Sequence, residues 1–507
     1  MGANLRNLPL FVILVAVSGL LMYLPAIHAL TLHQHAVARP FFYTGSLLLF
    51  VFVLLALATV ANRRGPRERS SLLTMVGAFT LLPLVLAIPF HEVMRDTSLF
   101  NAWWEMVSAL TTTGGTLYAP ARLPPSLHLW RALVGWSGGY FMLVMTIAVL
   151  APLRVGGFEI FFAGGPGGEV KDVNLRGTQR GVVTRDKMIG YALELLPVYT
   201  GLTGILWVLL RISGEDNLVA LCAAMSTLAT SGILPTSSLA SGQSSVLTEV
   251  IIFVFFLPAL SRRFWPGDGE MRATKRLRDD PELRLAAMIV LLTVILLFFR
   301  HWLAALDTDS HPGPGVILRT LWGGLFTTLS FLTTTGFESS GWEDARAWAG
   351  LGTPGLILSG LAIIGGGIAT TAGGVRLLRV YALIRHGERE LDLLVYPSSV
   401  GGGGSAARRL RRQGAFVAWI FFMLFALSIS VVMIAISYTG LDFEPAMIFT
   451  VAALSNTGPL TAVAGDFPLA WGDLSTAAKA ILAAAMVLGR LETLAIIALF
   501  NPELWRK

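Results

Sequence analysis

The sequence predicts an all-α polytopic membrane protein, in which a two-helix preface precedes four similar units around a pseudo-fourfold axis. Residues of the set A, V, I, L, M, F, W, Y and C make up 54% of the 507 residues, and charged residues only 14%. Globular domains carry about 25% charged residues. Ten apolar runs approach or exceed the length of about 18 to 20 residues that crosses a bilayer. The four units are indicated by short apolar pieces that each end in a cluster containing glycine.

The ten long apolar runs are the predicted membrane-spanning helices. The first, residues 8–27, exceeds the apolar core of a secretory signal peptide, which is about 7 to 15 residues long, so we expect a retained helix. The second is 41–61, which completes the preface. The others follow at 72–90, 129–151, 188–210, 245–260, 285–303, 354–384, 415–437 and 476–500.

The distribution of basic residues predicts the orientation of these spans. With the N-terminus inside, the cytoplasmic connections hold 28 Lys and Arg residues and the opposite side holds nine, while Arg490 lies within the last span. Short cytoplasmic loops accumulate basic residues, so both termini are expected in the cytoplasm. Fifteen acidic residues, Glu105 among them, give the outer face a net charge of about −6, which either concentrates cations or only solvates the loops.

Four shorter apolar pieces lie between successive spans, at 99–112, 217–229, 316–333 and 443–454. Each ends in small polar residues with a glycine, at 111–115, 229–233, 333–337 and 454–459, and these glycines are 118, 104 and 122 residues apart. We therefore divide the chain into five parts. They are the preface (1–68), repeat 1 (69–155), a cytoplasmic loop with repeat 2 (156–265), repeat 3 (266–385), and a cytoplasmic linker with repeat 4 (386–507).

These clusters predict a path for a monovalent cation. Non-helical backbone at membrane depth leaves polar groups without partners unless it is buried in protein or lines a water-filled path. Glycine accepts backbone angles that let neighbouring carbonyl oxygens face an axial ion, and a ring of carbonyls replaces part of its hydration shell. The competing interpretation is that Thr and Gly are simply common in membrane helices. It explains any one cluster, but explains four in matching positions poorly.

Two features of the later spans are unusual. Residues 365–374 interrupt the eighth span with five glycines and two threonines in ten positions. Glycine disfavours helix by about 1 kcal/mol per site relative to alanine, so we expect a flexible segment facing the path. Close helix packing through small residues is the alternative. Arg490 lies mid-span, where a charged side chain faces the bundle interior or water, and intramembrane Glu194 is either a packing partner or a vestibule charge.

No catalytic cluster is found in the sequence. It contains no HExxH or P-loop pattern, and the glycine stretch 164–168 lacks the Lys-Ser/Thr of a phosphate-binding loop. The single cysteine, Cys222, excludes an intramolecular disulfide and a multi-cysteine metal site. A net charge of +7 could indicate nucleic acid, but its distribution indicates topology instead. The basic stretch 401–412 is expected to bind anionic lipid or to dock a soluble partner.

Five passages together resemble the Trk/Ktr/HKT potassium-uptake family, and its Trk-type membrane subunit in particular. They are residues 107–114, 135–139, 365–376, 389–397 and 488–492. The resemblance covers nearly the whole chain, and the Trk-type branch also has a two-helix preface. It implies a multi-pass protein of the bacterial cytoplasmic (inner) membrane that takes up K+ as its transported ion, has no other cofactor and is not an enzyme.

The family's selectivity filter maps onto the four glycine clusters. The resemblance implies that the glycine of each loop marks the filter and that carbonyls beside it bind the ion. The residues are Thr112, Thr113, Gly114, Thr230, Ser231, Gly232, Thr334, Thr335, Gly336, Asn456, Thr457 and Gly458. Glycine in all four loops is typical of members that favour K+. Ser231 and Asn456 depart from the Thr-Thr-Gly form of repeats 1 and 3.

The resemblance also implies a gate and partners. An intramembrane gating loop and a pore arginine that acts as an electrostatic barrier would comprise Gly365, Gly366, Gly367, Thr370, Thr371, Gly373, Gly374 and Arg490. The alternative is a purely structural role, in which Arg490 holds carbonyl groups of the loop in place; we call this role a bolt. The implied partners are a second copy of the chain, in a homodimer, and a cytoplasmic ring of nucleotide-binding RCK domains. The alternatives are the K+-binding subunit of a K+-translocating P-type ATPase complex, a Na+-permeable member and a polytopic membrane enzyme.

Overall fold

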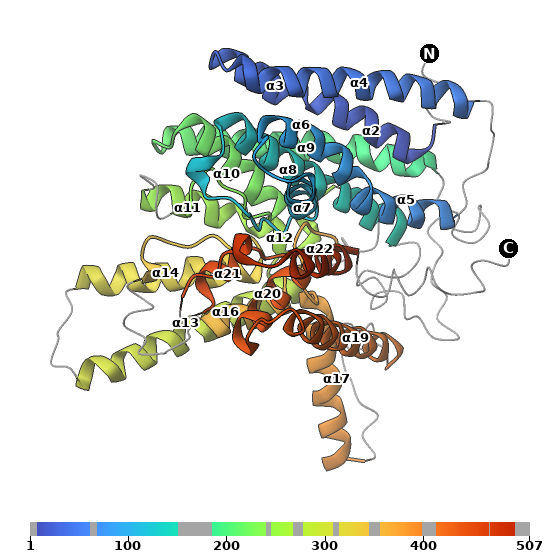
Figure 1. The fold of residues 1–507 in the computed structure, drawn as a ribbon. Helices are drawn as coiled ribbons and strands as arrows, with labels where there is room; N and C mark the ends of the chain where they lie inside the picture. The colour runs from blue at the N-terminus through green and yellow to red at the C-terminus, as the bar shows by residue number, and fades with distance from the viewer. Residues whose placement is uncertain are drawn as a thin grey trace.

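The computed structural model describes residues 8–60, 68–150, 185–239, 245–266, 277–307, 314–343, 355–397, 412–465 and 467–491. Within these ranges the regular structure is entirely helical (Figure 1). Among the described residues, six helices are long and apolar enough to cross a membrane: Leu10–Thr31, His35–Thr59, Thr74–Val93, Met188–Ile212, Pro281–Phe298 and Ala415–Ser437. The prediction of an all-α protein with many apolar helices is confirmed.

The preface is a pair of packed helices. Helices α2 (Leu10–Leu21) and α3 (Tyr23–Thr31) form the first span, and α4 (His35–Val60) forms the second. A Cβ added to Gly45 would lie 3.0 Å from the carbonyl oxygen of Gly19, so two glycines permit the close approach. In Figure 1 the pair α3 and α4 forms one edge of the molecule.

The other eight predicted spans also contain helices. In chain order these are α5 (Glu68–Thr80) with α6 (Leu82–Val93), α8 (Pro125–Met145), α9 (Arg185–Ile212), α11 (Val246–Phe255) with α12 (Leu257–Leu260), α13 (Pro281–Asp307), α16 (Gly355–Ile364) with α17 (Leu377–Val395), α19 (Arg412–Ser437) and α22 (Thr476–Leu491). In the described residues, the helices of four of the ten, α8, α11, α16 and α22, do not reach the length and hydropathy of a membrane span. For the last of them the comparison covers only part of the predicted span 476–500, because the described residues end at Leu491.

The four short apolar pieces fold as helices that stop at the glycine clusters. They are α7 (Leu99–Leu110), α10 (Asn217–Ala229), α14 (Pro314–Leu332) and α20 (Phe443–Leu454). Two of them begin with a side-chain cap, in which the Ser98 hydroxyl accepts from Asn101 N and the Asp216 carboxylate accepts from Leu218 N, each at 3.2 Å. Such caps satisfy amide groups that have no partner inside the helix. Helix α14 has 19 residues, which is slightly longer than its apolar pattern predicted.

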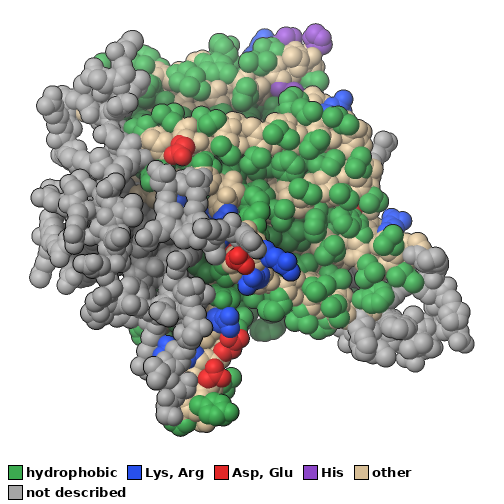
Figure 2. Space-filling view, turned by 180° about the vertical axis from the view of Figure 1, so that it is seen from behind, with side chains coloured by type: hydrophobic (Ala, Val, Ile, Leu, Met, Phe, Trp, Pro, Cys, Tyr) green, Lys and Arg blue, Asp and Glu red, His purple; other side chains and the backbone are tan. Residues whose placement is uncertain are grey.

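Apolar side chains cover much of the described part of the face that Figure 2 shows. Leu57, Ile212 and Leu318 have exposed fractions of 70%, 75% and 71%. A large exposed apolar surface indicates contact with another apolar phase. The surface of the helical bundle therefore agrees with a lipid environment.

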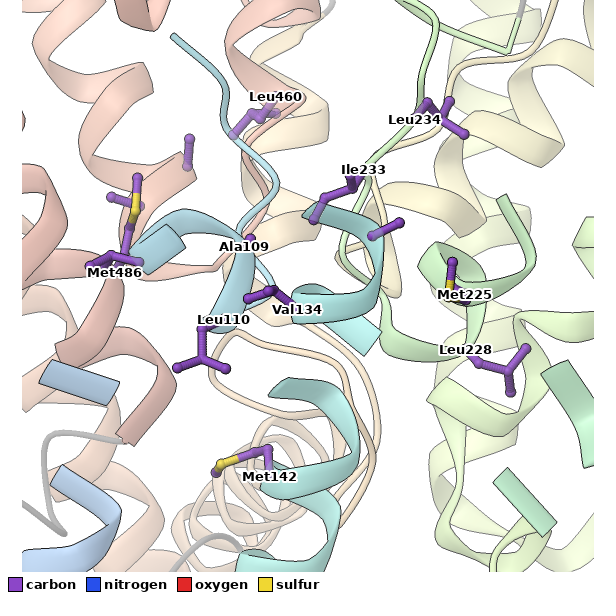
Figure 3. Close-up of a cluster of buried hydrophobic side chains, with 14 of the residues drawn as sticks. Ala109, Leu110, Val134, Met142, Met225, Leu228, Ile233, Leu234, Leu460 and Met486 are labelled. Atoms are coloured by element: carbon purple, nitrogen blue, oxygen red, sulfur yellow. The ribbon is translucent and has the colours of Figure 1, made fainter. Parts of the chain in front are cut away.

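A separate apolar core surrounds the ends of the short helices. Figure 3 shows buried side chains of this core from several elements, including Leu110 of α7, Met142 of α8, Leu228 of α10 and Met486 of α22. These contacts join segments that are far apart in the sequence. Leu110 and Leu228 anchor α7 and α10 in this core near the ends that carry their glycine clusters.

Several sequence expectations fall outside the described residues. They concern the glycine stretch 164–168, the linker and basic stretch 401–411, and Glu492.

Candidate functional site

The four short helices end in turns with the same backbone hydrogen bonds. In each turn, the residue before the cluster glycine donates its N–H to the carbonyl five positions earlier. These bonds are Thr113 to Ser108 (2.9 Å), Ser231 to Ser226 (3.0 Å), Thr335 to Ser330 (3.0 Å) and Thr457 to Ala452 (2.9 Å). In each turn the preceding residue also donates its N–H to the backbone. The two bonds together form the Schellman motif, which ends many helices at a residue in the left-handed conformation.

The left-handed residue in these turns is unusual. Glycine commonly takes that place, yet here it is Thr112 (φ 57°), Thr230 (φ 50°), Thr334 (φ 59°) and Asn456 (φ 56°). A β-branched residue with this φ is an outlier, and such strain costs of order 1–3 kcal/mol per residue. Three strained threonines in matching turns are therefore typical of a functional site.

The four turns meet in a closed ring. Each cluster glycine lies against the next turn, so that a Cβ there would approach a neighbouring atom to 3.0 Å or less. The pairs are Gly114 with the Ser231 carbonyl, Gly232 with the Thr335 carbonyl, Gly336 with Pro459, and Gly458 with the Thr113 carbonyl. Real Cβ atoms essentially never approach below 3.0 Å, which applies to Gly114, Gly232 and Gly458, while at Gly336 a side chain would also be strained by the φ of +79°. The ring therefore favours glycine at the four predicted positions.

Hydrogen bonds also join turn 4 to turn 1. Gly458 N donates to the Thr113 carbonyl at 2.6 Å. The Asn456 amide Nδ2 donates to Thr113 Oγ1 at 2.9 Å and to the Met486 carbonyl at 3.0 Å. The replacement of threonine by asparagine in repeat 4 therefore adds a bridge between the first and last repeats.

Two side-chain oxygens in the ring accept no hydrogen bond from the described residues. They are Thr112 Oγ1 and Asn456 Oδ1, both buried. Nearly all buried polar atoms in proteins have a partner, and exceptions commonly mark a place for water or an ion. Oxygen without a protein donor suits a partly dehydrated cation.

The glycine-rich segment interrupts its span as predicted. Helix α16 ends at Ile364 and α17 begins at Leu377, and residues 365–373 between them are buried. Backbone bonds close both ends of the segment, from Val375 N to Ile363 O at 2.8 Å and from Leu377 N to Gly366 O at 2.9 Å. The segment is therefore a compact buried loop.

This loop lies against three of the four short helices. Thr371 Oγ1 donates to the Leu228 carbonyl at the end of α10 at 2.9 Å, and Gly373 N donates to Thr334 Oγ1 at 2.8 Å. A Cβ on Gly373 would lie less than 3.0 Å from the Ser455 carbonyl that follows α20. The loop therefore adjoins the ring on the side of the helix C-termini.

Arg490 contacts the same loop. Its side chain is buried in α22, and Nη1 donates to the Thr371 carbonyl at 2.7 Å. Both interpretations of this arginine, as a bolt and as a barrier, involve this contact. The structure thus brings together the turns, the loop and the arginine that the sequence had singled out.

Buried acidic residues are the part that sequence reasoning missed. Glu105 was counted as a charge of the outer face, but it forms a buried ion pair with Arg131, with Nε and Oε1 2.7 Å apart. Glu249 of α11 is fully buried, and Glu282 Oε1 accepts from Ile368 N of the glycine-rich loop at 2.8 Å. The available signal was an acidic residue within or at the end of an apolar run. Glu194, by contrast, is exposed on α9, so it is not a buried packing partner.

Comparisons with known proteins identify the family. The family described as "TrkH: Cation transport protein" matches residues 285–507. "Trk system potassium uptake protein TrkH" of Salmonella typhimurium is 31% identical over 503 residues, covering 96% of each chain. The protein of that name from Vibrio parahaemolyticus is 31% identical over 505 residues, covering 97% of this chain and 98% of its own. The crystal structure of the potassium transporter TrkH from Vibrio parahaemolyticus matches 100% of both chains with a TM-score of 0.79 and 26% identity. Because such identity extends over nearly the whole length, this protein belongs to the TrkH family of cation transport proteins.

Proposed function

We propose that this protein takes up K+ across the bacterial cytoplasmic membrane, through a filter formed by the four turns. The observation that carries the proposal is the closed ring, in which each glycine lies against the next turn. The potassium uptake proteins to which the chain is similar match over nearly its full length. The membrane potential would drive uptake with about 2.3 kcal/mol per charge per 100 mV.

The proposed filter binds K+ mainly through backbone carbonyls. Their residues are the twelve of the four turns, Thr112–Gly114, Thr230–Gly232, Thr334–Gly336 and Asn456–Gly458. The C-terminal ends of α7, α10, α14 and α20 add negative potential where a cation would lose water. The two oxygens without a protein donor, Thr112 Oγ1 and Asn456 Oδ1, support this assignment. Glycine in all four loops favours K+ over Na+.

The proposed gate consists of the glycine-rich loop and Arg490. Residues 365–374 adjoin the ring, so a cation that has passed the filter next meets the loop. The Arg490 guanidinium contacts the loop at Thr371 and opposes a cation by charge. Opening then requires the loop and the arginine to move together.

The proposed assembly is a homodimer with both termini in the cytoplasm and a nucleotide-binding ring of RCK domains on that side. The excess of basic residues in the assigned inner connections supports the orientation. The name "Trk system", which the relatives carry, suits a membrane subunit with a regulatory partner. We assign no nucleic acid partner.

Rescue of a bacterium that lacks K+ uptake tests the function. The chain is expected to restore growth at low external K+, whereas Gly336→Asp, which places a carboxylate inside the ring, is expected to abolish it. Gly204→Ala is the matched control, because its Cβ would meet nothing within 4 Å. Failure of the unmodified chain both to rescue growth and to carry K+ into liposomes would refute K+ uptake.

The other functions predicted from the sequence are less well supported. The family consists of transporters, so the chain is not an enzyme. The K+-binding subunit of an ATPase complex would co-purify with an ATPase subunit, and purification from membranes tests this directly. A Na+-permeable protein would carry Na+ and K+ equally well in the liposome assay.

A further inference from the structure

Two buried carboxylates lie behind the polypeptide that leaves turns 1 and 3. We call these segments the returning limbs, residues 115–118 in repeat 1 and 337–341 in repeat 3. Each limb leaves the ring directly after its cluster glycine, so its position influences where the carbonyls of the turn point. Glu105 contacts the first limb and Glu249 the second.

Glu105 connects its limb to two helices. It lies on α7, and its side chain is 0% exposed. Oε2 accepts from Leu117 N at 3.1 Å, and Oε1 pairs with Arg131 Nε of α8 at 2.7 Å. The Ser108 hydroxyl, also on α7, donates to the Gly115 carbonyl at 2.7 Å. The first returning limb is therefore held at Gly115 and at Leu117.

Glu249 connects the third repeat to α11, which belongs to repeat 2. It lies on α11, is 0% exposed, and accepts three hydrogen bonds. Oε2 accepts from Ser339 Oγ and from Trp322 Nε1 of α14, both at 2.7 Å, and Oε1 accepts from Ser340 N at 2.8 Å. Three donors on two oxygens suit an ionised carboxylate, which only accepts. Burial of such a group is costly unless it is hydrogen-bonded in this way.

The two contacts occur at the same sequence position relative to the cluster glycine. Leu117 and Ser339 each lie three positions after the cluster glycine. Repeat 2 has Pro235 at this position, which has no N–H to donate. Repeat 4 has Thr461, whose hydroxyl donates to the carbonyl of Gly458 in its own turn at 3.1 Å. Buried carboxylates therefore contact this position in two turns that lie opposite each other in the ring order.

We propose that Glu105 and Glu249 are positioning residues that fix the returning limbs of turns 1 and 3, and thereby determine how strongly the ring distinguishes K+ from Na+. The inference rests on the proposed filter. A carbonyl ring that is free to contract coordinates the smaller Na+ better, so fixed limbs favour K+. Neither carboxylate need touch the ion.

The test uses the purified full-length chain in liposomes, with K+ and Na+ uptake measured separately. Glu249→Gln retains the length of the side chain but turns an NH2 group toward hydrogen-bond donors. We expect the K+/Na+ uptake ratio to fall about tenfold, since bonds to charged groups are among the stronger ones. Glu249→Asp keeps the charge but draws it back from Ser340 N, and is expected to lower the ratio as well.

Two further variants keep the test decisive. Ser339→Ala removes a single donor to Glu249 and is expected to lower the ratio by a smaller factor, even if Glu249→Gln does not fold. Asp96→Asn, in the exposed pair with Arg122, is the control and should leave the ratio unchanged. A merely structural role would lower the melting temperature and the yield of all Glu249 variants without changing the ratio.

The outcomes separate this inference from the proposed function. If the unmodified chain carries no K+, the filter itself is wrong. If it carries K+ selectively and folded Glu249→Gln and Ser339→Ala have the same K+/Na+ ratio, the filter stands and the positioning role is overturned.

Discussion

At Gly114 the addition of one side chain changes both the backbone and the ring. Its φ is +77°, and a Cβ would lie less than 3.0 Å from the Ser231 carbonyl. Because strain of this kind costs of order 1–3 kcal/mol, we expect Gly114→Ser to lower the K+/Na+ uptake ratio by about tenfold or more. Uptake of each ion by the variant in liposomes provides the measurement.

The control for this change is Gly204→Ala in α9, where nothing lies within 4 Å of the new Cβ. It should leave the ratio unaltered. If the Gly114→Ser variant still selects K+ over Na+, Gly114 is not part of the filter.

Substitution of Arg490 tests the proposed gate. We expect Arg490→Ala to increase cation flux, because it removes a buried positive charge beside the Thr371 carbonyl. Arg490→Gln distinguishes the two roles, since a glutamine retains an N–H donor without the charge. Flux that stays raised in Arg490→Gln indicates a barrier, whereas a return to the original flux indicates a bolt. Both are measured in liposomes under the same membrane potential.

At the residue scale the sequence predicted the role of the cluster glycines better than the role of the buried acidic residues. The four cluster glycines could be found because similar short segments recur along the chain. Glu249 could not be assigned a role, because its partners Ser339 and Ser340 lie 90 and 91 residues away. The left-handed threonines were also unpredictable, since backbone preference alone disfavours them and only packing in the ring maintains them.

At the element scale, glycines of two long helices fit against the ends of two short ones. A Cβ on Gly138 of α8 would lie less than 3.0 Å from the Leu110 carbonyl, and one on Gly489 of α22 equally close to the Leu454 carbonyl. Overpacking commonly costs about 1–3 kcal/mol. We expect Gly138→Ala and Gly489→Ala each to lower the melting temperature and the yield of folded transporter, as measured by thermal unfolding in detergent.

Gly360→Ala in α16 is the matched control, because its Cβ would meet nothing within 4 Å. It should unfold at the original temperature. Equal unfolding temperatures for all three variants would mean that α8 and α22 can move away from the short helices at little cost.

Helix positions followed well from hydropathy, because apolar runs and the glycine clusters fix where helices lie and stop. The extent of each helix followed less well. Helix α14 starts at Pro314, before its apolar pattern, and the span 354–384 divides into α16 and α17. The loop between them makes hydrogen bonds to Leu228 of repeat 2 and to Thr334 in the turn of its own repeat, 39 residues away. A local sequence pattern does not predict contacts between residues that lie far apart in the chain.

At the scale of the whole molecule, the orientation of the chain remains a prediction that cysteine labelling can test. Cys222 is buried in α10, so Cys222→Ala gives a background without thiols. Tyr438 and Leu394 have exposed fractions of 88% and 79% and lie after the predicted ninth and eighth spans. In intact cells an impermeant thiol reagent should label Tyr438→Cys. It should label Leu394→Cys only after the membrane is opened, and the reverse pattern would invert the topology.

The class of the whole molecule was the most predictable property. Composition and apolar runs indicated a helical membrane protein, and the order of the motifs indicated the family. The closed ring was predictable only as a convergence of four turns. Its actual contacts depend on how glycine, Pro459 and Asn456 pack across repeats, which is decided by the tertiary structure.

The bridge between Asn456 and Thr113 also has a consequence for biosynthesis. It joins residues 343 positions apart, so the ring closes only after almost the entire chain has been made and inserted. Contacts of such long sequence separation form late in folding. An unfinished or truncated chain would therefore lack the completed ring that we propose as the cation site, and synthesis can proceed without opening a selective pathway across the membrane of a growing cell.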